Sequence, residues 1–159
     1  MYYRRLVPYN VLHDELDVDS EDQHPGYTVG GTIIGKRIPL EDLGATLYVL
    51  PPGNAQAPYH WHHNTEEALL VLAGQPTLRT PDEQRRLRPG DFVSFPCGPR
   101  GAHKVVNDTA EHARYLIFST KPSSDIVEYP DSRKVGFGSR GMGSRMVRDE
   151  PSLDYWEGE

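Results

Sequence analysis

The sequence has little cysteine and no long apolar segment. Cys97 is the single cysteine among 159 residues, so the chain cannot form an internal disulfide. This fits a reducing compartment, and we expect a cytoplasmic protein. No apolar run approaches the roughly 20 residues of a membrane span, and the first residues lack the apolar core of a signal peptide. We therefore expect no membrane partner.

Positive charge is also scarce. The 17 Lys and Arg residues are outnumbered by 23 Asp and Glu, which gives a net charge of −6. Proteins that grip nucleic acid usually carry a basic face, because phosphate contacts supply most of the affinity. Here the basic residues are scattered, apart from residues 85–88 and a loose group between 133 and 148. We expect no nucleic-acid partner.

Glycine and proline, in contrast, are abundant, with 15 and 14 residues. They separate short β-prone runs, as turn residues do in all-β proteins. Many short strands at close spacing predict a sandwich or a barrel. The expected strands are residues 27–34, 45–50, 68–72, 77–80, 85–87, 92–95, 103–106 and 115–119.

A chain of this length fits one domain, residues 1–159. We expect a core barrel at about 27–121, an irregular or partly helical N-terminal arm at 1–26, and a C-terminal extension at 122–159. A short helical turn is expected near residues 40–43. The extension has one more β-prone piece at 126–129, and its aromatic end at 153–156 is expected to pack somewhere rather than form a solvated tail.

The segment with the clearest chemistry is Gly53-x6-His60-x-His62-x4-Glu67-x6-Gly74. Residues two apart on a strand point to the same side, so His60 and His62 converge on one face. Glu67 returns at the start of the next strand. Two imidazoles and one carboxylate form a set that suits Fe(II) and related metals. Taken alone, His-x-His can equally be a pair of surface histidines beside an acid.

Two neighbouring residues compete for a place in this set. Strand alternation sends Glu66 to the opposite face, and the interval to Gly74 favours Glu67 as the ligand. His63 points away from His60 and His62 by the same parity. A pocket could be lined by aromatic side chains whose facing the sequence leaves open, namely Tyr59, Trp61, Phe95 and Tyr115.

A second segment, Gly90-x5-Pro96-x-Gly98-x4-His103-x3-Asn107, places a histidine at the entry of a strand. With the first segment it resembles the cupin superfamily, whose motifs are G-x5-H-x-H-x3–4-E-x6-G and G-x5-P-x-G-x2-H-x3-N. This chain has one extra residue before His60 and two extra before His103, both in turns. The two motifs span residues 53–107.

The resemblance implies a cupin jelly-roll β-barrel with His60, His62, Glu67 and His103 inside one mouth. Three imidazoles and a carboxylate imply one divalent transition metal, Fe, Mn, Ni, Co or Zn. Because the ligands must be unprotonated, affinity is expected to fall below about pH 6. Such barrels often pair through sheet edges, so a homodimer is expected.

The tail resembles the C-terminal extension of a group of bacterial single-domain cupins, some named as sugar-phosphate-isomerase-like. The matching residues are 128–136 and 154–159. We expect a small-molecule ligand or substrate at the metal, with isomerase- or dioxygenase-type chemistry. The alternative is a metal-dependent sensor or binding protein that performs no reaction, because this fold serves many functions.

Overall fold

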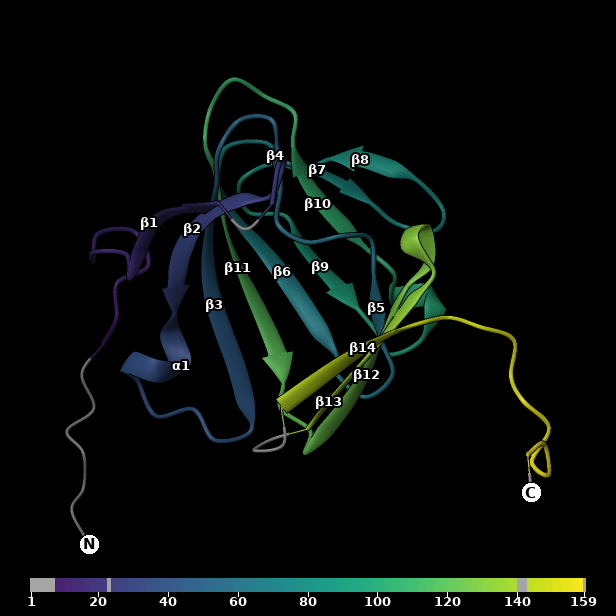
Figure 1. Ribbon diagram of the computed structural model, residues 1–159. Coiled ribbons are helices and arrows are strands. Elements are labelled where there is room, and N and C mark those ends of the chain that lie inside the picture. The colour runs from purple at the N-terminus through teal and green to yellow at the C-terminus, as the bar shows by residue number, and fades with distance from the viewer. Residues whose placement is uncertain (1–7, 23, 140–142, 159) are drawn as a thin grey trace, which may run out of the picture.

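The computed structural model describes residues 8–22, 24–139 and 143–158. Antiparallel strands dominate it (Figure 1), and they form three sheets. The helical pieces are short: α1 at Ile34–Arg37 and the 3-10 turns η1 at Pro99–Gly101 and η2 at Pro130–Ser132. None of the helices in the described parts of the chain has the length and apolar character needed to cross a membrane.

The largest sheet has six strands in the order β1-β2-β3-β11-β6-β9. Its bounds are β1 Val18–Asp22, β2 Thr28–Ile33, β3 Leu43–Leu50, β11 Ala113–Thr120, β6 Glu67–Ala73 and β9 Phe92–Phe95. β11 lies at the centre and pairs along its full length with β3. Alternation along β6 turns Glu67, Leu69 and Val71 to one face, so the sheet places Glu67 at the end of a buried apolar row.

A second sheet of four strands lies opposite, in the order β4-β10-β7-β8. Its strands are β4 Asn54–Ala55, β10 Lys104–Asn107, β7 Thr77–Arg79 and β8 Gln84–Arg86. β7 and β8 form a hairpin around Pro81-Asp82, with Leu78 and Leu87 buried. The first two sheets together make the barrel that the strand pattern allowed and the jelly roll that the resemblance implied (Figure 1).

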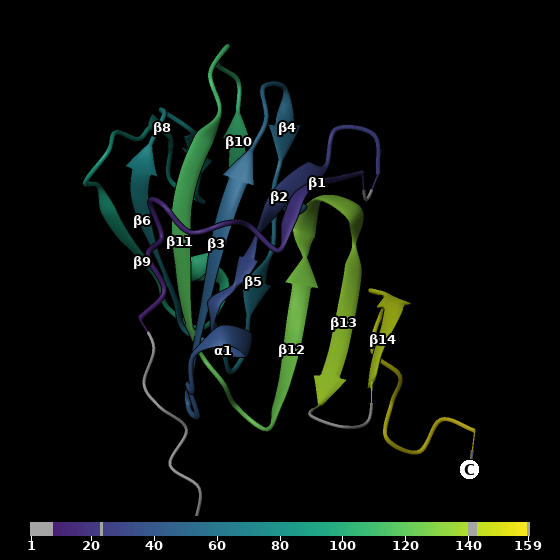
Figure 2. The ribbon, with the colours of Figure 1, turned by 90° about the vertical axis from the view of Figure 1, so that its left-hand side faces the viewer.

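The C-terminal extension forms a third sheet, in the order β14-β13-β12-β5. It consists of β12 Ser124–Tyr129, β13 Lys134–Ser139 and β14 Gly143–Arg148, and it joins the barrel through β5 Trp61–His62. Figure 2 shows β12, β13 and β14 side by side along one flank of the barrel. The predicted β-prone piece at 126–129 is part of β12, and the two strands after it were not expected.

Two apolar clusters stabilise this arrangement. The first fills the barrel and includes Leu69, Val71, Val105 and Tyr115. The second lies on the outer face of β3 and β11, where the N-terminal arm and α1 cover Leu47. Burying a side chain of this size contributes roughly 1.5–3 kcal/mol. The barrel can therefore hold polar groups at its mouth without losing its core.

The ends of the chain differ from the sequence predictions. The arm is not irregular or helical throughout, because Val18–Asp22 pairs with β2. The helical turn lies at Ile34–Arg37, before residues 40–43. Leu153, Tyr155 and Trp156 are 71%, 83% and 72% exposed, so the expectation that the aromatic end packs was wrong. Aromatic content favours burial on average but does not create a surface to pack against.

Candidate metal centre

His60 and His103 lie opposite each other across an isolated antiparallel bridge. The His60 amide donates to the His103 carbonyl at 3.1 Å, and the His103 amide donates back at 2.9 Å. This pairing brings the two ring centroids to 4.6 Å, although the residues are far apart in sequence. The side chains are 8% and 3% exposed, so both imidazoles are held by the backbone inside the barrel mouth.

His62 and Glu67 complete the group from β5 and β6, which follow each other in the chain but belong to different sheets. One carboxylate oxygen, Glu67 Oε2, lies 3.4 Å from His62 Nε2 and 3.4 Å from His103 Nε2. One potential ligand atom from each of His60, His62 and Glu67 lies within 4.8 Å of the others, so these three could hold a metal ion. The structure thus brings together all four side chains that the motifs selected.

Each imidazole is oriented through its Nδ1 atom. His60 Nδ1 lies 2.7 Å from the Pro58 carbonyl oxygen, and His103 Nδ1 lies 2.9 Å from the Gly101 carbonyl oxygen. A carbonyl only accepts, so both rings carry their proton on Nδ1 and leave Nε2 as a lone-pair donor. This is the tautomer that a metal ligand bound through Nε2 requires.

The third imidazole is oriented by an acid from the extension. His62 Nδ1 lies 2.5 Å from Asp125 Oδ2 on β12. The same carboxylate accepts hydrogen bonds from Thr65 Oγ1 at 2.8 Å and from the Asn64 amide at 2.9 Å. Metal-bound histidines commonly donate their other ring N–H to a carboxylate, so Asp125 has the position of such an outer partner. Asp125 was not among the site residues predicted from the sequence.

The charges at this centre are strongly coupled. Burial lowers the pKa of His60, and burial together with the neighbouring His60 lowers the pKa of His103 to about 4. Burial also opposes the protonation of His62, but proximity to Glu67 and Asp125 outweighs it and raises that pKa. The three histidines lower the pKa of Glu67 against the effect of its burial. Two neutral imidazoles and a carboxylate are therefore available as ligands at neutral pH.

The donor set fits a divalent transition metal. Bonds of about 2.1 Å place ligand atoms that share one ion roughly 3–4 Å apart, and the observed 3.4 Å separations agree with this range. Among the described residues, His62 Nε2 is buried without a hydrogen-bond partner. A buried nitrogen normally has a partner, and an ion at this position would supply one.

The residues that compete with these four point elsewhere. Glu66 is exposed, whereas Glu67 is half-buried in the cluster, as alternation predicted. His63 is exposed and pairs with Glu128 at 3.1 Å, and the Trp61 ring lies 4.4 Å from the His63 ring, away from the ligands. Glu66 and His63 thus lie away from the cluster, as strand parity, and for the acids also the interval to Gly74, had predicted.

The aromatic side chains divide among different surroundings. Phe95 stacks on His103, with ring centroids 3.8 Å apart and an interplanar angle of 11°. Tyr115 is buried in the core, and Tyr59 packs under the guanidinium of Arg79 at 4.0 Å. Tyr129, which was not anticipated, lies 5.9 Å from His60 with nearly parallel rings. Phe95 and Tyr129 thus shield two of the histidines from solvent.

A cavity of about 620 Å³ opens beside this centre. His62 and Glu67 line it on the barrel side, and β13 and β14 supply residues of the opposite wall, including Arg145. A volume of this size fits a small organic ligand. The extension thus both orients one histidine and encloses the space next to it.

The fold and the site define a β-barrel protein with a cluster of histidines and one carboxylate that could hold a metal ion. Similarity to known proteins narrows this class. The cupin domain model matches residues 46–119. A candidate sugar phosphate isomerase from Acidithiobacillus ferrooxidans is 31% identical, with a TM-score of 0.77 over 87% of this chain and 90% of that one. The chain belongs to the cupin superfamily.

A second solved structure extends the likeness in fold. A sugar phosphate isomerase of the cupin superfamily from Silicibacter pomeroyi has a TM-score of 0.79 at 22% identity. The match covers 94% of this chain and 98% of that protein, so the shared fold includes the extension. No curated protein is similar enough to the chain to match it.

Proposed function

We propose that His60, His62, Glu67 and His103 bind one divalent transition metal and that a small molecule reacts at this ion. The observation that carries the proposal is that ligand atoms of His60, His62 and Glu67 lie within 4.8 Å of one another, with His103 Nε2 3.4 Å from Glu67 Oε2. A mixed nitrogen and oxygen set with open positions suits Fe(II), Mn(II), Ni(II) or Co(II), and Zn(II) is also compatible.

The chain's own residues have three tasks in this proposal. The carbonyls of Pro58 and Gly101 hold two histidines in the ligating tautomer. Asp125 holds the third, and because it already bonds His62 and Thr65 it serves as a positioning residue rather than a proton acceptor for substrate. Phe95 covers one face of His103 and restricts water to the open side.

We favour isomerase-type chemistry on a small hydroxylated substrate such as a sugar or sugar phosphate. When bound, the metal would act as a Lewis acid toward a carbonyl or hydroxyl oxygen. The name of the Acidithiobacillus ferrooxidans relative supports this choice, since it shares 31% identity along most of the chain. The adjacent cavity of about 620 Å³ is large enough for such a substrate.

Dioxygenase-type chemistry is the second candidate. Two histidines and one carboxylate on one face are the set found in non-haem Fe(II) oxygenases, and His60, His62 and Glu67 make such a group. The fourth ligand, His103, leaves fewer open positions for both oxygen and an organic substrate. This difference is why isomerisation is preferred.

Metal content and turnover test the proposal together. Purified protein is expected to contain about one transition-metal ion per chain, and His62→Ala to lose it. His63→Ala is the matched control, because this adjacent histidine is exposed and bonds Glu128. Equal metal content in the two variants would contradict the site.

Substrate screens then separate the chemistries in protein loaded with Fe(II), Mn(II) or Zn(II). Interconversion of aldose and ketose sugars or their phosphates without oxygen uptake is the expected result. Oxygen consumption would instead establish the dioxygenase. Ligand binding at the metal with no turnover would establish the non-catalytic sensor and reject the enzyme.

A further inference from the structure

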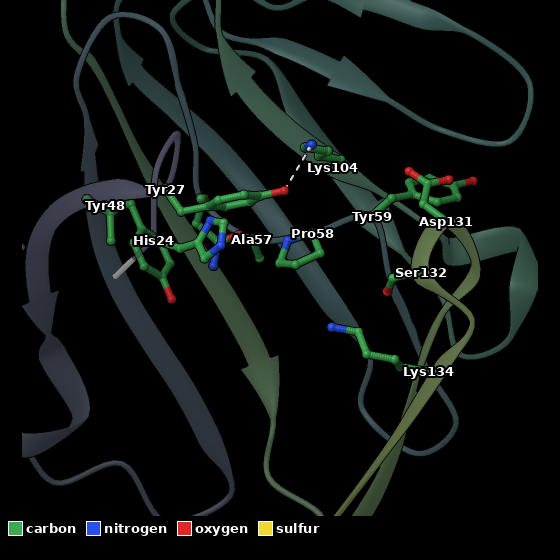
Figure 3. Close-up of a pocket in the computed structure, with 12 residues that line it drawn as sticks. His24, Tyr27, Tyr48, Ala57, Pro58, Tyr59, Lys104, Asp131, Ser132 and Lys134 are labelled. Atoms are coloured by element: carbon green, nitrogen blue, oxygen red, sulfur yellow. Dashed lines mark hydrogen bonds between the residues drawn. The ribbon is translucent and has the colours of Figure 1, made fainter. Parts of the chain in front are cut away.

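Figure 3 shows the residues that line a second cavity, of about 630 Å³. It is lined by residues of separate elements, among them Tyr27 before β2, Lys104 at the start of β10 and Lys134 at the start of β13. It shares no lining residue with the cavity beside His62 and Glu67. The two cavities are therefore distinct spaces, although Pro58, which lines this one, also orients His60.

The charge of this cavity is opposite to that of the whole protein. Lys104 and Lys134 line it, and Asp131 is the only acid among its lining residues. Asp131 is already neutralised by Arg79, whose two nitrogens lie 2.6 and 3.0 Å from its oxygens. The lining thus keeps an excess of positive charge, with Asp131 shared between Arg79 and the more distant Lys104, in a chain with a net charge of −6.

Neither ammonium group is paired with a carboxylate within the described residues. Lys104 Nζ donates to Tyr27 Oη at 3.3 Å, and Lys134 Nζ lies 5.5 Å from the centre of the Tyr129 ring. Figure 3 shows the two side chains reaching from different walls, with Pro58 between them. An ammonium group that has only neutral contacts retains donors for an anion.

The remaining lining groups suit a hydroxylated molecule. The phenols of Tyr27, Tyr48 and Tyr59 offer donors and acceptors, and Gln56 and Ser132 add more. The aromatic rings give flat apolar surface, and polar groups fixed on such a surface are typical of small-molecule sites. The volume falls within the range of about 300–1,000 Å³ that such sites occupy.

We propose that this second cavity binds a small, anionic, hydroxyl-bearing molecule, with Lys104 and Lys134 contacting its charged group. The charged group is a phosphate or a carboxylate. Two residues that line the cavity are close in sequence to proposed metal ligands: Lys104 directly follows His103, and Pro58, whose carbonyl orients His60, lies two residues before it. Since none of the four proposed ligands lines it, binding does not require a metal ion.

Calorimetry on chelator-treated and metal-loaded protein tests the proposal with three probes: glucose 6-phosphate, glucuronate and glucose. At least one anionic probe is expected to bind with similar affinity in both forms, and glucose to bind at least tenfold more weakly. Lys104→Met and Lys134→Met each remove a charge but keep an apolar stem. Each is expected to weaken binding by about tenfold, the loss of one charge-assisted contact.

Lys36→Met on α1 is the matched control, because it makes the same charge change at an exposed residue outside the cavity. It is expected to leave binding unchanged. Circular dichroism and metal content of the two cavity variants check that they remain folded. The proposal is overturned if the Lys104→Met, Lys134→Met double variant binds the anions as tightly as the wild type does. It is also overturned if the wild type no longer binds the anions after the metal has been removed. If the wild-type protein binds no metal ion but still binds the anions, the proposed function is rejected and the proposal for this cavity stands.

Discussion

The barrel and the C-terminal extension contribute to the metal centre in different ways. The barrel holds its ligands through backbone pairing: His60 and His103 bond each other's main chain, and Glu67 begins a strand that is paired on both sides. The extension contributes two side chains, Asp125 beside His62 and Tyr129 beside His60, and a wall with an exposed outer strand, β14. The barrel part therefore supplies the four proposed ligands and orients His60 and His103 through backbone carbonyls, while the extension orients His62 and encloses the adjacent cavity.

Removing a barrel ligand is the strongest test of this division. Glu67→Gln takes away the only carboxylate of the proposed set and is expected to weaken metal binding by more than 100-fold, beyond the about 10–100-fold that an outer partner contributes. Metal titration with competing chelators measures it. Glu66→Gln is the matched control and is expected to change nothing, because Glu66 is exposed. A similar loss in both variants would show that the binding is nonspecific.

The buried barrel histidine also makes metal-free stability depend on pH. The pKa of His103 is lowered from 6.5 to about 4, first by burial, so the unfolded chain takes up this proton before the folded chain does. Acidification from pH 6.5 to about 4 therefore lowers the free energy of unfolding, by about 3 kcal/mol from this group.

Comparison with His103→Gln isolates that effect. His62, whose pKa is raised, acts in the opposite direction: its stabilisation is present below its unfolded pKa and is lost as pH rises through its folded pKa. The free energy of unfolding of the wild type minus that of His103→Gln, measured by urea unfolding at each pH, should therefore decline from pH 6.5 to 4. A difference that stays constant over this range would mean that His103 is not buried in the metal-free protein.

Asp125 tests the contribution of the extension. Asp125→Asn keeps the size of the side chain but replaces a charged acceptor that His62 Nδ1 and Thr65 use. Metal affinity is expected to fall about 10–100-fold, less than for Glu67→Gln. Glu128→Gln on the same strand is the control, because Glu128 bonds the exposed His63. An unchanged affinity in Asp125→Asn would limit the metal centre to the barrel.

The difference between barrel and extension also explains what the sequence could predict. All eight expected strands after residue 26 correspond to observed strands, because glycine and proline mark their ends. The choice of Glu67 over Glu66 followed from alternation within one strand. Asp125 lies 63 residues from His62, and its role depends on β5 pairing with β12, for which no local pattern exists.

The same limit applies to the acidic strand β1. Its sequence, Val-Asp-Ser-Glu-Asp, has little strand propensity, and it pairs because the edge of β2 offers free backbone groups. Gly74 shows the opposite case, where a motif residue has a local reason. Its φ is +73°, and a Cβ there would lie 2.5 Å from the His112 carbonyl oxygen.

The exposed aromatic end of the extension gives the smallest expected effect. Tyr155 and Trp156 contact each other, with centroids 4.8 Å apart, and are mostly exposed. Replacing both with Ser should change the free energy of unfolding by less than about 0.5 kcal/mol at low protein concentration. Denaturation at several protein concentrations, with light scattering for mass, measures this. A loss of stability that grows with concentration would mean that the two rings are buried against a second copy, as a homodimer built on the extension requires.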